Sequence, residues 1–302
     1  MSVVLLATVG YDRHSGASEK MSLAESLMDS RPDSALDILN SVNVETLDGK
    51  RNKARYALLK SMALDKNYVD TTNFDVLQPA IDYFLRKGTA DEKLKTYYYQ
   101  GRVYQNQGDD DSAMQSFMRG REYCGQASDT LMMANLLVAQ GTILYTTYKF
   151  DDFIKVNLEA TKLYKAIGKI DYEISCLANA LDGSIITNDK QLADSILYVA
   201  EARVCENEEL SSSISPYILL YAVNFGNDQE VVDIIHNYDS IQAIDDVTKI
   251  DLAEAYCKIG DSSNAMRVIN SIPSTSEHKT SLKYLALKPN VLELNGDFKG
   301  AL

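Results

Sequence analysis

Residues 94–127 read LKTYYYQGRVYQNQGDDDSAMQSFMRGREYCGQA, and this stretch decides the fold class. Counted from Leu94, small residues occupy positions 8, 20 and 27, and large apolar or aromatic residues occupy positions 4, 11 and 24. The small residues are Gly101, Ala113 and Gly120, and the large ones are Tyr97, Tyr104 and Phe117. This spacing predicts two antiparallel helices that approach closely at the small residues and are separated by the large ones.

A turn between these two helices is predicted at Gly108, which is position 15 of the same stretch. Glycine accepts the positive φ that ends many helices, and the aspartates that follow can cap the next helix. The complete pattern resembles that of the tetratricopeptide repeat (TPR) family. The resemblance implies an all-α fold, a right-handed α-α superhelix of helical hairpins, in which the first helix of each hairpin lines a concave face that holds a peptide or a protein partner.

The pattern recurs with changes at 134–167 and again at 174–207. Tyr148 and Asn188 stand where the turn glycine is expected, and Phe153 stands at the small position 20. Because these residues depart from the pattern, we expect the turns at Tyr148 and Asn188 and the helix contact at Phe153 to differ in detail from those of the repeat at 94–127.

Two further repeats, each of the same length as the first, follow at 212–245 and 246–279. Two less regular hairpins precede residue 94, and a last one begins near His278. The sequence therefore predicts about seven helical hairpins plus a truncated eighth, in one continuous TPR-like superhelix over residues 18–302.

Residues 1–17 are expected to form an N-terminal arm. Its run VVLLATV resembles the end of a signal-peptide h-region, although the basic segment that precedes such a region is missing. This remnant favours the periplasm or cell envelope over the cytoplasm. No apolar run reaches the roughly 18–20 residues that a membrane-spanning helix needs, so no transmembrane helix is expected in this chain.

Composition argues against several classes of protein. The chain has 30 Lys and Arg against 43 Asp and Glu, a net charge of −13, which disfavours nucleic-acid binding. Its four cysteines are far apart and have no histidine at metal-ligand spacing, so neither a zinc site nor a disulfide framework is expected. Because no nucleophile-and-base motif is found, we expect no catalytic residues, no metal and no cofactor.

Charge is unevenly distributed along the chain. The segment from Lys50 to Lys60 holds five basic residues and no acidic one, whereas 228–261 holds nine acidic and two basic residues. One interpretation is ordinary solubilising surface charge. The sharper hypothesis is that the acidic stretch steers a basic partner toward the chain, or that it binds the basic hairpin of a neighbouring molecule of the same protein. The second case would be self-association.

Candidate binding residues follow from the groove positions of the TPR family, namely 2, 5, 9 and 12 of each repeat. They are Lys95, Tyr98, Arg102, Gln105, Asn135, Thr142, Tyr145 and Asp182. They do not reproduce the carboxylate clamp of chaperone-binding TPR proteins, but tyrosine, arginine and amide side chains can contact a peptide. The alternative is that they are ordinary solvated helix residues. Within the run of tyrosines, Tyr97 is expected in the core and Tyr98 on the groove.

The resemblance implies a protein- or peptide-binding scaffold. The arrangement also resembles the extracytoplasmic TPR arrays of Bacteroidetes signalling proteins, which implies the sensor or interaction portion of a bacterial cell-envelope signalling protein. Two alternatives stay open: a surface nutrient-binding lipoprotein, and a cytosolic regulator that binds a signalling peptide. The chain has no tryptophan for the exposed aromatic platforms that the first alternative uses.

Overall fold

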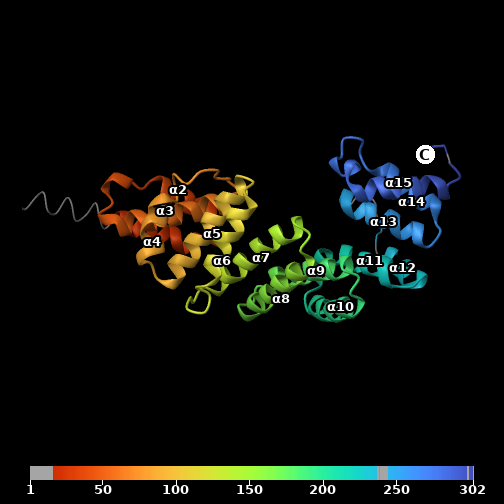
Figure 1. Ribbon diagram of the computed structural model, residues 1–302, viewed down its shortest axis with the longest axis horizontal. Helices are drawn as coiled ribbons and strands as arrows, with labels where there is room; N and C mark the ends of the chain where they lie inside the picture. The colour runs from red at the N-terminus through yellow and green to blue at the C-terminus, as the bar shows by residue number, and fades with distance from the viewer. Residues whose placement is uncertain (1–15, 237, 239–243, 298, 302) are drawn as a thin grey trace, which may run out of the picture. The chain divides into compact units, whose positions relative to one another are not determined.

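The computed structural model describes residues 16–236, 238, 244–297 and 299–301, and all regular structure in these residues is helical (Figure 1). The predicted all-α class is therefore confirmed. Most of the predicted N-terminal arm lies outside the described residues, while residues 16 and 17 already belong to a helix over residues 16–27. None of the described helices is both long enough and apolar enough to cross a membrane.

The chain divides into two compact units, Met1–Thr147 and Tyr148–Leu302. Unit 1 contains the helix over 16–27, α2 Pro32–Asn40, η1 Val44–Thr46, α3 Gly49–Lys66, α4 Gln78–Lys87, α5 Ala90–Asn106, α6 Asp110–Arg121 and α7 Thr130–Thr146. Unit 2 contains α8 Phe150–Ala166, α9 Ile170–Ile186, α10 Lys190–Cys205, η2 Glu208–Leu210, α11 Ser211–Phe225, α12 Asp228–Ile235, α13 Asp246–Lys258, α14 Ser262–Ser271, η4 Glu277–Thr280 and α15 Leu282–Leu294. Continuity of the superhelix from one unit to the next stays a prediction.

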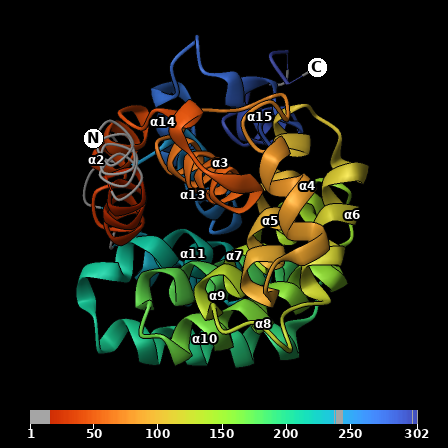
Figure 2. The ribbon, with the colours of Figure 1, turned by 90° about the vertical axis from the view of Figure 1, so that its left-hand side faces the viewer.

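Neighbouring helices pack as hairpins within each unit. In unit 1, α3 packs against α4 and α5 against α6, and α3 also contacts α2 and α5 (Figure 2). In unit 2, α13 packs against α14 and also contacts α15. Each hairpin thus buries its apolar face against the hairpin next to it, as stacked repeats do.

The hairpin of α5 and α6 packs as its small residues predict. A Cβ atom placed on Gly101 would lie 2.6 Å from Cδ1 of Phe117, and one placed on Gly120 would lie 2.7 Å from Cδ1 of Leu136 in α7. Ala113 and Phe117 are fully buried. The small positions therefore set the distance between α5 and α6 and between α6 and the next repeat.

The tyrosines of α5 are arranged differently from the prediction. Tyr99 is the core residue, with 3% of its surface exposed, whereas Tyr97 is half-buried and stacks on Tyr123 at 6.1 Å between ring centroids. The assignment of Tyr97 to the core was therefore wrong. Because successive residues of α5 are about 100° apart, Tyr97 and Tyr99 lie on nearly opposite sides of the helix, and the side of Tyr99 faces the core.

The turns after α3, α5, α7 and α9 share one backbone conformation. Positive φ angles occur at Tyr68 (56°), Gly108 (76°), Tyr148 (58°) and Asn188 (57°), which follow one another at equal intervals along the chain. The expectation that the turns at Tyr148 and Asn188 differ was therefore wrong. A closing hydrogen bond of the Schellman type, from residue 189 N–H to residue 184 C=O at 2.9 Å, holds Asn188 in this conformation.

The helix contact at Phe153 differs from that of the repeat pattern, as predicted, and Gly183 accounts for the difference. Phe153 is buried, with 5% of its surface exposed, although a small residue is expected at its position. A Cβ atom on Gly183 of α9 would lie 3.1 Å from Cδ1 of Phe153 and 2.7 Å from Cγ1 of Ile154. The small residue has thus moved from α8 to the facing helix α9.

We expect Tyr68→Gly to stabilise the chain by about 0.5–1 kcal/mol, because a left-handed conformation strains every residue but glycine. The ring of Tyr68 is 94% exposed, so its removal sacrifices little packing. Urea unfolding measures the change, and Gly108→Ala, at the equivalent turn, should lower stability by a similar amount. A destabilised Tyr68→Gly protein would contradict the prediction.

Candidate functional site

A cleft of about 430 Å³ lies between α3 and α5 in unit 1. Its α3 wall is Arg51, Asn52, Arg55, Leu58, Leu59 and Met62, its α5 wall is Asp91, Glu92 and Lys95, and Glu25 and Phe84 complete it. The α3 residues recur at spacings of three and four, which places them on one face of the helix. We call this site the α3–α5 cleft.

The floor of the α3–α5 cleft is apolar. Leu58, Leu59 and Met62 are buried with 6%, 3% and 8% of their surfaces exposed, and Phe84 of α4 is 1% exposed. The guanidinium of Arg51 lies 5.7 Å from the centroid of the Phe84 ring, within cation–π distance. The cleft therefore offers an apolar surface bordered by a cation.

The rim of the cleft consists of ion pairs that join successive repeats. Arg55 binds Glu25 at 2.6 Å and Arg51 binds Glu92 at 2.6 Å. One partner of each pair is well exposed: the Arg51 side chain is 54% exposed against 22% for Glu92, and Glu25 is 50% exposed against 32% for Arg55. Ion pairs that are this exposed contribute roughly 0–1 kcal/mol each, so a ligand can exchange with one partner at little cost.

Asp91 has a different role, because it fixes the start of α7. Its carboxylate accepts hydrogen bonds from the N–H groups of Ser128 (2.7 Å) and Asp129 (2.9 Å) and from the Ser128 hydroxyl (2.8 Å). Burial opposes ionisation of Asp91, but these hydrogen bonds and Lys95 outweigh it and hold its pKa below the ordinary value. Lys95 in turn binds Asp129 at 2.8 Å.

Polar and aromatic residues continue along α5 beyond the cleft. Arg102 binds Asp65 of α3 at 3.0 Å and donates a hydrogen bond to Oε1 of Gln105 at 2.9 Å. Tyr98 is half-buried, and its ring meets that of Tyr99 edge-on at 4.9 Å. Burial, and then the charge of Asp65, raise the pKa of Tyr98, so its hydroxyl stays protonated and can donate a hydrogen bond.

The structure brings together part of the predicted site. Lys95 lines the cleft, and Arg102 contacts Gln105. On α7, Asn135 is half-buried, Thr142 is exposed and donates to the Val138 carbonyl at 3.3 Å, and Tyr145 is 41% exposed. Asp182 is half-buried on α9 and belongs to unit 2.

Sequence reasoning missed the α3 half of the site, namely Arg51, Arg55 and Asp65. These residues lie in a hairpin that fits the repeat pattern poorly, so no groove positions were assigned there. One signal was present: Arg51 and Arg55 are four residues apart and precede Leu58 and Leu59 at helical spacing, which places cations and apolar residues on one face.

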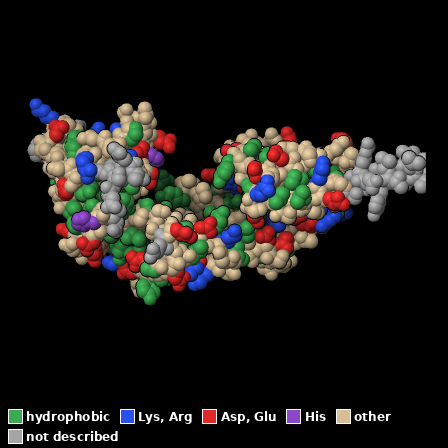
Figure 3. Space-filling model, turned by 180° about the vertical axis from the view of Figure 1, so that it is seen from behind, with side chains coloured by type: hydrophobic (Ala, Val, Ile, Leu, Met, Phe, Trp, Pro, Cys, Tyr) green, Lys and Arg blue, Asp and Glu red, His purple; other side chains and the backbone are tan. Residues whose placement is uncertain are grey.

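The two charged stretches are largely engaged within their own units. Arg51 and Arg55 form the ion pairs above, and Lys60 donates a hydrogen bond to Asn40. In the acidic stretch, Asp245 caps α13 and Asp251 binds Lys283 at 2.6 Å. Figure 3 shows Lys and Arg interspersed with Asp and Glu on the face that it draws. Among the described residues, no three His, Cys, Asp or Glu lie close enough to hold a metal ion.

Comparison with known proteins supports the fold. No family model matches the chain, and no curated protein matches it. The crystal structure of a Rap protein complexed with competence and sporulation factor is similar, with a TM-score of 0.58, 13% identity, and coverage of 94% of this chain and 84% of that one. The apo form of RapI is similar with a TM-score of 0.70, 12% identity, and coverage of 94% and 83%. At this identity the likeness shows the fold alone, an all-α TPR-like helical repeat.

Proposed function

We propose that this chain is a scaffold that binds a peptide or a segment of another protein, with the α3–α5 cleft as the anchoring site. The observation that carries the proposal is the buried apolar floor surrounded by exposed, exchangeable ion pairs. Its volume of about 430 Å³ lies within the roughly 300–1,000 Å³ that ligand pockets occupy. The similar Rap protein is complexed with competence and sporulation factor, which agrees with this use of the fold.

The geometry defines the ligand that fits best. One apolar side chain would lie against the floor formed by Leu58, Leu59, Met62 and Phe84. A neighbouring carboxylate would replace Glu25 or Glu92 as the partner of an arginine, and such bonds are charge-assisted and strong. We therefore propose a ligand with an acidic residue beside a large apolar one, and a binding role without catalysis.

The cell-envelope setting is a separate proposal, and it rests on the run VVLLATV near the N-terminus. That run lies outside the described residues. The alternative is a cytosolic regulator that binds a signalling peptide, and the likeness to a Rap protein in complex with competence and sporulation factor favours it. Fractionation of cells that express the natural gene separates the two settings.

A peptide selection tests the binding proposal. Random peptides displayed on phage would be selected on the full chain, and each enriched peptide would be titrated by fluorescence anisotropy. We expect Arg51→Ala with Arg55→Ala to weaken binding about tenfold, which corresponds to roughly 1.4 kcal/mol. The matched control is Lys50→Ala with Lys53→Ala, which removes the same charge from exposed positions of α3 outside the cleft.

Two outcomes would contradict this assignment. Equal loss of affinity in both double variants would mean that only net charge matters. Peptides that respond to Arg102→Ala with Tyr145→Ala, but not to the cleft substitutions, would place the binding site at the TPR groove positions of α5 and α7 instead.

A further inference from the structure

The two arginines that line the α3–α5 cleft differ in how firmly their own chain holds them. Nη2 of Arg55 donates hydrogen bonds to Oε2 of Glu25 at 2.6 Å and to the hydroxyl of Ser22 at 3.1 Å, and both acceptors belong to the helix over 16–27. The Arg55 side chain is 32% exposed. Arg55 therefore joins α3 to the preceding helix through two acceptors.

Arg51 is held through a single acceptor among the described residues, namely Oε1 of Glu92 at 2.6 Å. Its side chain is 54% exposed, and its guanidinium lies 5.7 Å from the centroid of the Phe84 ring on the cleft floor. A guanidinium carries five N–H donors in one plane, so most donors of Arg51 are open to a second carboxylate. A carboxylate bound there would lie next to the apolar floor.

Glu92 has a second role that does not need Arg51. Its other oxygen, Oε2, accepts a hydrogen bond from the Thr89 N–H at 2.8 Å, and its own N–H donates to the Thr89 hydroxyl at 3.2 Å. These bonds form a capping box at the start of α5, where the helix end also favours negative charge. Glu92 therefore keeps a partner when Arg51 binds another carboxylate. The carboxylate of Glu25, by contrast, is bound by Arg55 alone within the described part of the chain.

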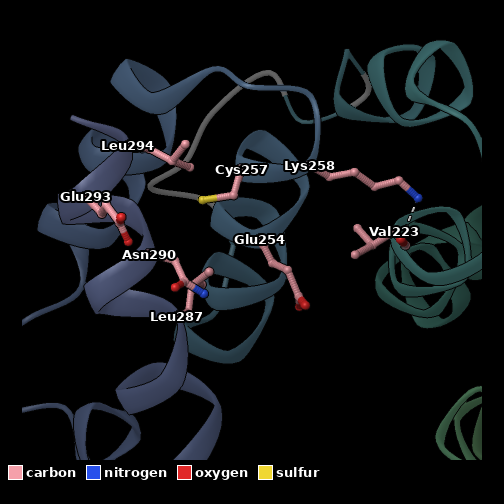
Figure 4. A pocket seen from close by; sticks show the side chains of 8 residues that line it. All are labelled: Val223, Glu254, Cys257, Lys258, Leu287, Asn290, Glu293 and Leu294. Carbon is pink, nitrogen blue, oxygen red and sulfur yellow. Dashed lines mark hydrogen bonds between the residues drawn. The ribbon is translucent and has the colours of Figure 1, made fainter. Parts of the chain in front are cut away.

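A larger cavity, of about 600 Å³, lies between α13 and α15 of unit 2 and shows the opposite arrangement (Figure 4). Lys258 belongs to its lining, but it extends toward α11 and donates hydrogen bonds to the carbonyls of Ala222 (3.0 Å), Val223 (2.6 Å) and Gly226 (2.8 Å). These acceptors lie at the C-terminal end of α11, where a helix carries partial negative charge. Lys258 is therefore committed to its own chain and is not available to a ligand carboxylate as Arg51 is.

We infer that Arg51 is the residue through which the α3–α5 cleft selects an acidic ligand, and that Glu92 occupies the place of the ligand carboxylate until the ligand displaces it. This assignment rests on the proposed function and narrows it from either arginine to one. Arg55 instead fixes the helix over 16–27 against α3. The cleft thus contains an internal competitor, Glu92, which lowers its affinity for acidic ligands.

Glu92→Gln and Glu25→Gln form a matched pair of variants, because each removes one negative charge from the lining of the cleft. Glutamine can replace glutamate in a capping box, so Glu92→Gln leaves the start of α5 intact. The peptides enriched by phage selection on the full chain would be titrated against both variants by fluorescence anisotropy. We expect Glu92→Gln to raise affinity about threefold more than Glu25→Gln does, since only Glu92→Gln removes the competitor for Arg51.

Neutral copies of the same peptides, with Gln or Asn in place of the acidic residue, provide a second control. They should bind Glu92→Gln and Glu25→Gln equally, because they carry no carboxylate for Arg51. In addition, Arg51→Ala alone should reproduce the roughly tenfold loss expected when both arginines are replaced. Arg55→Ala with Glu25→Gln, which removes the other ion pair without changing the net charge, should change affinity less than about twofold.

Three results would overturn the inference and leave the proposed function in place. They are an equal gain of affinity in Glu92→Gln and Glu25→Gln, a gain that persists with the neutral peptides, and a loss of affinity that follows Arg55 rather than Arg51. Enriched peptides that respond to the cleft substitutions but contain no acidic residue would also overturn it. Peptides that respond to none of the cleft substitutions would contradict the proposed function itself, and the role of Arg51 with it, so the two failures are distinguishable.

Discussion

Arg203→Met is expected to lower the free energy of unfolding of unit 2 by about 3 kcal/mol. Glu173 of α9 is only 1% exposed, and both of its carboxylate oxygens accept hydrogen bonds at 2.9 Å from Nε and Nη2 of Arg203 in α10. Removal of the guanidinium leaves a buried carboxylate without its cation. The Arg203 side chain is 24% exposed, so water compensates part of this loss and the value falls at the low end for buried pairs.

A second substitution separates the ion pair from packing. Urea unfolding followed by circular dichroism would compare Arg203→Met with the double variant that also carries Glu173→Met. Because an apolar pair of similar size often replaces a buried ion pair without cost, we expect the double variant to regain most of the lost stability. A double variant no more stable than Arg203→Met would show that the loss came from packing instead.

Gly101→Ala is expected to destabilise unit 1 by about 2 kcal/mol. The new methyl group would lie 2.6–2.7 Å from Cδ1 and Cζ of Phe117, whose ring is fully buried and cannot move aside without displacing α6. The overpacking penalty exceeds the roughly 1 kcal/mol that alanine gains over glycine within a helix.

The control for this prediction is Gly125→Ala, because nothing lies within 4 Å of the Cβ atom placed there. We expect it to change stability by no more than about 0.5 kcal/mol. In a Phe117→Leu background, Gly101→Ala should cost clearly less than in the wild-type protein. An undiminished cost in that background would mean that contact with the Phe117 ring is not its cause.

Much of the hairpin of α5 and α6 could be predicted from sequence, because its close contacts depend on residue size at fixed spacing. Gly101, Ala113 and Gly120 mark those contacts, and each has the predicted role. The turns were harder to predict. Tyr148 and Asn188 suggested different backbones, yet hydrogen bonds and flanking helices impose the left-handed conformation that Gly108 adopts freely.

The candidate site was only half predictable. Positions on α5 such as Lys95 and Arg102 followed from the repeat pattern, but their partners Asp129 and Asp65 belong to the neighbouring repeats and are distant along the chain. Which side chains meet across repeats depends on how far neighbouring helices slide and rotate, and no local spacing records this. The α3–α5 cleft results from this relative sliding and rotation of neighbouring helices.

The same left-handed turn recurs at residues 68, 108, 148 and 188. The segment between two successive turns is therefore a unit that can be duplicated or deleted in the gene. An in-frame duplication or deletion of residues 69–108 joins a turn to its equivalent, so the succession of helices is preserved without a new kind of junction. A shorter or longer change in the same region would join a turn to the interior of a helix. The series is interrupted at residue 226, because Gly226 has φ −81° and ends its helix in an extended conformation, and the left-handed turn returns at Gly260 and Gly296.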